Sequence, residues 1–231
     1  MSLDRLATLL SGLTVEAAGP AVAAPDLTLA AEGPAFRLAT TAPAPLFSAR
    51  LRWGAAARRL WQAAPALVTT PGTPLHALAT LAVAEATSPR CGAEALLKGY
   101  AEALVVHRLR QAIEAGAGQG GLLAGLADAR LARALTALHD APARAWRAED
   151  MAAEAGMSRS AFLRAFAATL GEPPATYLRR FRMDRARADL VGGARVADVA
   201  RRYGYRSPDA FARAYRRAEG QPPSAQSSHT A

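Results

Sequence analysis

Arg164 and Arg213 occupy equivalent places in two copies of one sequence motif. A guanidinium group is planar and presents its N–H donors as a rigid fork. The fork matches a pair of neighbouring acceptors, and atoms O6 and N7 of guanine form such a pair in the DNA major groove. Two arginines at matching positions therefore suggest that bases are recognised at two places, provided that the surrounding elements point both side chains outward.

The motif that contains these arginines is repeated about 48 residues further along the chain. Each copy has an alanine, a glycine four residues later, two aromatic residues four apart, another glycine and a pair of prolines. The first copy consists of Ala152, Gly156, Phe162, Phe166, Gly171, Pro173 and Pro174, and the second of Ala200, Gly204, Phe211, Tyr215, Gly220, Pro222 and Pro223. This spacing predicts a helix, a tight turn and a second helix in each copy, the unit that places a recognition helix in the major groove.

Individual residues explain why each copy should fold in this way. Ala152 has a small side chain, which lets two crossing helices approach closely, and Gly156 lies at the turn, where a positive φ costs glycine nothing. Ser158 is a natural N-cap for the next helix, and Ser207 followed by Pro208 is a stronger start in the second copy. Both recognition helices therefore have defined beginnings.

The aromatic pair in each copy marks the buried stripe of its recognition helix. At about 100° per residue, the opposite face carries Ser160 and Arg164 in the first copy and Asp209 and Arg213 in the second. The two copies thus present an arginine at the same register. They differ in the neighbouring residue, because the Asp209 carboxylate is able to accept a hydrogen bond from cytosine N4.

The stretch from Asp128 to Pro223 resembles the AraC/XylS family of bacterial transcription regulators. Residues 146–160 resemble the first positioning helix, the turn and the start of the recognition helix, residues 171–182 the entry to a long joining helix, and residues 196–215 the second unit. In that family one recognition helix enters each of two successive major-groove segments. The resemblance therefore implies a sequence-specific transcription regulator.

The resemblance also implies which side chains contact DNA. By position, those facing the bases are Ser160, Leu163, Arg164, Asp209, Ala210 and Arg213, in agreement with the helical faces above. Candidates for phosphate contacts, which fix register without carrying sequence information, are Ser158, Arg159, Arg179, Arg206 and Ser207. The chain departs from the family pattern after Pro223, where the family usually continues with an aromatic and a basic residue on a closing helix.

Positive charge is concentrated in this same part of the chain. Of a formal net charge of +9, residues 144–223 hold +7, from 16 arginines against 9 acidic residues, whereas residues 1–143 hold only +2. A compact basic segment is typical of proteins that bind phosphate backbones. The same charge would also suit a non-specific architectural DNA-binding protein with a non-functional sensor region, so that alternative stays open.

The N-terminal region differs in composition, because it contains many prolines and short apolar runs. Residues 27–29, 36–38 and 46–53 are such runs, and in the last of them alternating apolar and arginine side chains have the period of a half-buried strand. Residues 93–114 predict a helix of about six turns, which either packs on the β region or pairs with a second subunit.

We therefore expect an α+β fold, with a small, partially cupin-like β region and helices followed by an all-α double helix-turn-helix domain. Residues 1–115 would form a degenerate cupin-like sensor and dimerisation region, residues 116–127 a glycine-rich linker, and residues 128–231 the DNA-binding domain. The cupin likeness is best at residues 50–57 and 90–110, but the region is short for a complete barrel. It also lacks closely spaced histidines for a metal ion, and we interpret His76 and His107 as structural.

No catalytic or metal site is evident in the sequence. Cys91 is the only cysteine, which excludes an internal disulfide and a multi-cysteine zinc site. No nucleophile, base and orienting residue occur together in a recognisable pattern. We therefore expect no enzyme activity, no metal and no cofactor.

The expected partner is double-stranded DNA. RNA polymerase, a second copy of the chain and a small-molecule effector of unknown type are further candidates. The N-terminus lacks the basic start of a secretory signal, and the longest apolar segment elsewhere, residues 75–86, is too short to span a bilayer. These features predict a cytoplasmic protein that does not bind membranes.

Overall fold

A computed structural model describes Leu6, Leu10 and residues 13–53, 55–115 and 120–225. The chain divides into two compact units. The sheet unit consists of residues 10–53 and 57–118, and the helical unit is built mainly of residues 119–231. The described strands all lie in the sheet unit, so the predicted α+β class is confirmed.

An antiparallel sheet of five strands forms the centre of the sheet unit. The strands are β1 (Thr14–Gly19), β2 (Leu27–Glu32), β3 (Ala35–Ala39), β4 (Phe47–Arg52) and β5 (Leu67–Val68), in the order β1-β4-β2-β3-β5. The predicted runs coincide with β2, β3 and β4. In β4 the side chains of Arg50 and Arg52 are exposed while Leu51 and Trp53, the residue after the strand, are buried, which confirms the half-buried strand.

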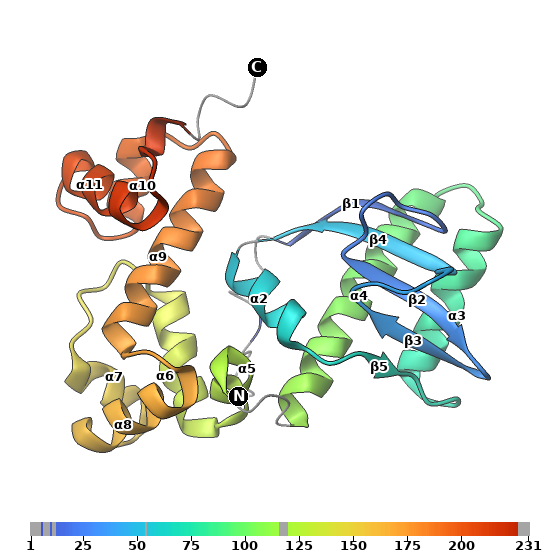
Figure 1. The fold of residues 1–231 in the computed structure, drawn as a ribbon, viewed down its shortest axis with the longest axis horizontal. Coiled ribbons are helices and arrows are strands. Elements are labelled where there is room, and N and C mark those ends of the chain that lie inside the picture. Colours follow the sequence, from blue (N-terminus) through green and yellow to red (C-terminus); the bar gives the residue numbers. More distant parts are fainter. Residues whose placement is uncertain (1–5, 7–9, 11–12, 54, 116–119, 226–231) are drawn as a thin grey trace. The chain divides into compact units, whose positions relative to one another are not determined.

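The sheet unit also contains three helices, α2 (Ala55–Ala63), α3 (Pro74–Thr87) and α4 (Ala93–Glu114). Helices α3 and α4 pack against each other and against strands of the sheet, and Figure 1 shows both along one face of it. Helix α4 has the predicted bounds, and its stripe from Leu97 to Arg108 is buried. Because α4 contacts β1 and β4, this stripe packs on the β region within one chain.

Arg108 is buried in the apolar stripe of α4, only 3% exposed. Its guanidinium lies over the ring of Trp61, 3.9 Å from the centroid, and donates hydrogen bonds to the carbonyl oxygens of Ala64 and Pro65. Burial lowers the pKa of Arg108 to about 10. Arg108 therefore joins α4 to the end of α2, which explains a charged residue at a core position.

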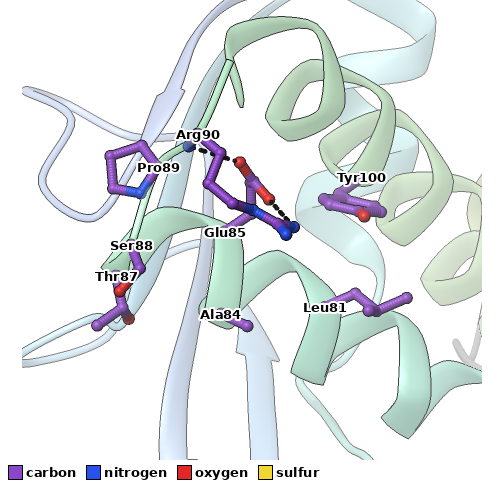
Figure 2. A pocket seen from close by; sticks show the side chains of 8 residues that line it. All are labelled: Leu81, Ala84, Glu85, Thr87, Ser88, Pro89, Arg90 and Tyr100. Atoms are coloured by element: carbon purple, nitrogen blue, oxygen red, sulfur yellow. Dashed lines mark hydrogen bonds and ion pairs between the residues drawn. The ribbon is translucent and has the colours of Figure 1, made fainter. Parts of the chain in front are cut away.

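Glu85 holds the loop between α3 and α4. The side chain is 4% exposed, and its two carboxylate oxygens accept hydrogen bonds of 3.1 Å from the backbone N–H and from Nη2 of Arg90. Figure 2 shows this pair in a hollow between the two helices, with Leu81 and Tyr100 on its walls. The backbone N–H of Arg90, followed by its side chain, lowers the pKa of Glu85, so the carboxylate stays ionised and the loop is held in place.

The helical unit contains two short helices followed by the two predicted helix-turn-helix units. Its elements are α5 (Gly121–Ala127), α6 (Ala129–Asp140), α7 (Ala148–Ala155), α8 (Arg159–Leu170), α9 (Pro174–Val191), α10 (Val196–Arg202), α11 (Pro208–Glu219) and the 3₁₀ turn η1 (Pro223–Ala225). Where the family pattern has a closing helix, the described chain has this single turn. Figure 1 shows α9 as a long helix with α7 and α8 near one end and α10 and α11 near the other.

Helix α5 corrects the prediction of a linker over residues 116–127. Residues 116–119 lie outside the described part of the chain, but the following seven residues are helical and pack against α6 and α8. A Cβ atom on Gly125 would lie 2.9 Å from Leu170 Cδ2 and 3.0 Å from Leu135 Cδ1, so the glycine permits close packing. Gly125 therefore serves contact between helices rather than freedom of the chain.

None of the described helices combines the length and the apolar character needed to cross a membrane.

Candidate nucleic-acid interface

The first helix-turn-helix unit consists of α7, a turn at Gly156 and α8. Gly156 has φ +66°, and the N–H of Met157 donates to the carbonyl of Ala152 at 2.9 Å, which closes the end of α7. The hydroxyl of Ser158 then accepts from the N–H of Ala161 at 3.4 Å, as an N-cap does. The predicted turn and cap of the first unit are confirmed.

The second unit repeats this geometry with α10 and α11. Gly204 has φ +78°, and the N–H of Tyr205 donates to the carbonyl of Ala200 at 2.9 Å, the same five-residue step as in the first unit. The hydroxyl of Ser207 accepts from the N–H of Ala210 at 3.1 Å, and Pro208 begins the helix. The repeated sequence therefore produces two turns of the same kind.

Aromatic side chains hold each recognition helix by one face. Phe162 and Phe166 of α8 are fully buried, and Phe166 meets the edge of Tyr177 from α9 with centroids 5.6 Å apart. In the second unit Phe211 and Tyr215 are fully buried in a cluster with residues of α9 and α10. Because the aromatic face of each helix is buried, the opposite sides of α8 and α11 point away from their cores.

The residues predicted to face bases lie on these outer sides. Ser160, Arg164, Asp209 and Arg213 are exposed, while Leu163 and Ala210 are partly buried at the flanks. No hydrogen bond or ion pair joins Arg164, Arg213 or Asp209 to another described residue. Both guanidinium groups are therefore available to a partner.

The residues predicted to contact phosphate differ in their surroundings. Arg159 forms an ion pair of 3.0 Å with Glu149, in which both side chains are 63% exposed. Arg206 is exposed and has no described partner, and Arg179 is exposed on α9. The hydroxyls of Ser158 and Ser207 accept cap hydrogen bonds, which leaves their O–H groups free to donate to a phosphate oxygen.

Most acidic residues of the helix-turn-helix region are engaged in ion pairs with arginines. All nine acidic residues between positions 144 and 223 are described, and eight of them form ion pairs with arginines: Glu149, Asp150, Glu154, Glu172, Asp184, Asp189, Asp198 and Glu219. The exception is Asp209. Because Asp209 lies in the first turn of α11, the helix dipole also favours its charge there.

Two groups in this unit, one buried and one partly buried, were not singled out from the sequence. His139 of α6 is 2% exposed, lies 2.7 Å from the hydroxyl of Tyr177 and stacks on Phe181. Arg182 of α9 donates to the carbonyls of Pro142 and Arg144. A usable signal for Arg182 was its place four residues after the buried Leu178, on a stripe where a basic side chain is unusual.

Within the described residues, no group of three or more histidine, cysteine, aspartate or glutamate side chains is arranged to hold a metal ion. The single cysteine, Cys91, is exposed and unpaired.

The paired turns, the joining helix and the two outward faces define a double helix-turn-helix domain. A family model described as "Helix-turn-helix domain" matches residues 151–227. The C-terminal part of the chain therefore matches a helix-turn-helix domain model, in agreement with the resemblance found in the sequence.

Two curated relatives of the chain are named as AraC-like regulators. A putative AraC-like transcription regulator from Streptomyces lividans is 39% identical over 166 residues, which cover 69% of this chain and 55% of the relative. Another from Streptomyces antibioticus is 40% identical over 122 residues, or 52% of this chain and 40% of the relative. The chain thus spans about half the length of the curated relatives that it matches.

Two solved structures are similar to parts of this chain. The DNA-binding domain of AdpA, a global transcriptional factor solved in complex with a target DNA, is 36% identical and covers 38% of this chain and 80% of its own, with a TM-score of 0.36. A transcriptional regulator from Chromobacterium violaceum is 22% identical, covers 46% of this chain and 97% of its own, and has a TM-score of 0.41.

Proposed function

We propose that this protein is a sequence-specific transcription regulator that reads two successive major-groove segments of DNA with α8 and α11. The observation that carries the proposal is the matched pair of outward arginines. Arg164 and Arg213 lie at the same register of two equivalent helices, and neither has a partner among the described residues. An unpaired guanidinium on a recognition helix is suited to a bidentate contact with guanine.

The distribution of charge supports the same proposal. Six arginines of the helical unit are engaged by the eight paired acids: Arg144, Arg159, Arg180, Arg187, Arg201 and Arg202. The net positive charge therefore rests on the other arginines, which include Arg164, Arg206 and Arg213. Such a placement attracts the phosphate backbone to the reading side of the domain.

The relatives support a regulatory role. Two curated proteins, which match the chain over 69% and 52% of its length, are named as putative AraC-like transcription regulators. These names describe regulators rather than enzymes. On this basis we assign the chain a DNA-binding role and no catalytic one.

The deciding experiment is a selection of bound sequences from random DNA duplexes with the full chain, followed by affinity measurements at one salt concentration. For a specific regulator we expect the selected duplex to bind at least about a thousandfold more tightly than random DNA. The selected sequence should contain two conserved blocks about one helical turn apart. Equal affinity for selected and random DNA would reject this proposal and favour the non-specific architectural protein.

A further inference from the structure

The long helix α9 is not the only connection between the two helix-turn-helix units. Residues 142–144, which join α6 to α7, run between α9 and the second unit, and we call them the brace. From one side Arg182 of α9 donates from Nε to the carbonyl of Pro142 at 2.6 Å and from Nη2 to the carbonyl of Arg144 at 2.8 Å. One guanidinium thus ties both ends of the brace to α9.

The second unit contacts the brace from the other side, through its turn. A Cβ atom built on Gly204 would clash with the carbonyl oxygen of Ala143, in the middle of the brace. The corresponding glycine of the first unit, Gly156, has a similar φ of +66°, but its added Cβ would meet only the flexible end of Arg133, at 3.0 Å. Both turns need glycine for their backbone conformation, whereas only Gly204 also needs it for contact with another backbone segment.

Burial makes the Arg182 side of this contact costly to break. The guanidinium is partly buried, and this burial lowers the pKa of Arg182. The neighbouring Tyr205, which follows Gly204, is partly buried as well. Removal of the guanidinium would leave the carbonyl oxygen of Pro142 without its donor in a partly buried contact, a loss that such groups tolerate poorly, and would also break the exposed bond to the carbonyl of Arg144.

We infer that the brace, held by Arg182 and by the turn at Gly204, fixes the spacing between α8 and α11 and so restricts the protein to one spacing of DNA segments. The inference rests on the proposed function for its consequence on DNA, but not for its structural part. One inserted base pair displaces a DNA segment by about 3.4 Å along the axis and about a tenth of a turn around it. Two recognition helices on a rigid support cannot follow that displacement, while two helices joined by α9 alone can follow it in part.

The structural part is tested in the free, full-length protein by electron spin resonance distance measurements. Spin labels would be attached to Ala168→Cys in α8 and Ala218→Cys in α11, both at exposed positions, in a Cys91→Ser background that removes the exposed native cysteine. With the brace intact we expect one narrow distance distribution. Arg182→Ala should broaden the distance distribution, and Arg182→Lys, which retains a donor, should give a distribution of intermediate width.

The two turn glycines provide a matched control. Gly156→Ala and Gly204→Ala introduce the same backbone strain, but only Gly204→Ala also forces a side chain against the Ala143 carbonyl. We expect Gly204→Ala to shift or broaden the distance distribution and Gly156→Ala to leave it narrow. Equal distributions for the wild type, Arg182→Ala and Gly204→Ala would overturn the inference.

The consequence for DNA is measured with the selected duplex and a copy that has one base pair inserted between its two blocks. We expect the insertion to weaken wild-type binding at least about tenfold, comparable to a mismatched base pair. In Arg182→Ala the ratio of the two affinities should fall by at least about threefold, because the helices adjust to the longer spacing. An unchanged ratio would overturn the inference, whereas a failure to select any sequence would reject the proposed function and leave the spin-label measurement to decide on the brace.

Discussion

At the scale of single residues, Arg164 and Arg213 are expected to read different DNA segments. We predict that Arg213→Ala removes about 1–3 kcal/mol of base discrimination in one block of the selected sequence and leaves the other block intact, with Arg164→Ala giving the mirror result. The measurement is a selection from random duplexes for each variant. An unchanged base preference in Arg213→Ala would show that Arg213 of α11 does not discriminate between bases.

Arg159→Ala is the contrasting variant, because Arg159 is expected to contact phosphate. It should weaken binding to all sequences alike and reduce the slope of log affinity against log salt by about one. The ion pair with Glu149 competes with the phosphate for the same guanidinium. A change in base preference in this variant would indicate that Arg159 contacts bases rather than phosphate.

His139 predicts a pH dependence of stability. Burial, followed by the charge of Arg185, lowers its pKa from 6.5 to about 3 in the folded protein, so the folded protein binds fewer protons than the unfolded chain between these values. Its contribution to stability is therefore complete above about pH 6.5 and is lost progressively as the pH falls towards 3. The midpoint of thermal unfolding should be lower at about pH 5 than at about pH 7.5. In His139→Gln, which retains a polar partner for Tyr177 but cannot titrate in this range, this part of the pH dependence should disappear.

At the scale of helices, Ser207 combines a cap with a predicted phosphate contact, and substitution separates the two roles. Ser207→Ala should destabilise the protein by about 1 kcal/mol through loss of the cap on α11. Ser207→Asp keeps a capping oxygen and should retain stability, yet its negative charge should weaken binding to all DNA. Urea unfolding and affinity measurements on the same samples provide the test. Loss of stability in both variants would show that the aspartate cannot cap in this position.

Two glycines inside helices are expected to respond oppositely to alanine. Gly99 of α4 is exposed, and an added Cβ would meet nothing within 4 Å, so Gly99→Ala should stabilise the protein by about 0.5–1 kcal/mol. In Gly125→Ala of α5 the new methyl group would press on Leu170 and Leu135, and we expect a loss of stability. The sign of the change in unfolding midpoint distinguishes the two cases, and stabilisation by Gly125→Ala would disprove the close packing of α5.

The helices also show what can be predicted from sequence and what cannot. The bounds of α4 and the two helix-turn-helix units were predicted because they depend on local signals: apolar periodicity, caps and turn glycines. The strand order β1-β4-β2-β3-β5 was not predicted, because it depends on pairing between distant segments. Helix α5 was missed because a glycine that permits close packing has the same sequence signature as one that loosens a linker.

The candidate site follows the same division. The exposure of Arg164 and Arg213 could be inferred from periodicity, since the position of their aromatic neighbours fixes the opposite face. The brace could not be inferred from the sequence, because Arg182 and Gly204 contact residues that lie 38–61 positions earlier in the chain. Likewise the ion pairs that engage eight acidic residues became apparent only in three dimensions.

At the scale of the whole molecule, the location of charge should matter more than its total. Arg206→Ala and Arg202→Ala change the net charge equally, but Arg206 has no described partner, whereas Arg202 is paired with Asp189 at 2.9 Å. We predict that Arg206→Ala weakens DNA binding and lowers its salt dependence, while Arg202→Ala has a smaller effect. Filter binding over a range of salt concentrations would compare them, and equal losses would indicate that total charge governs the affinity.

The open sheet has a consequence for the tendency of the protein to aggregate. Open sheets expose unpaired backbone groups at their two edges, and such edges recruit strands from other chains into aggregates. Here one edge strand, β5, has only two residues, and the other, β1, is interrupted by a bulge between Val15 and Ala17 and lies against α4. Each edge therefore offers a poor template for a further strand, which disfavours edge-to-edge association of copies of this sheet.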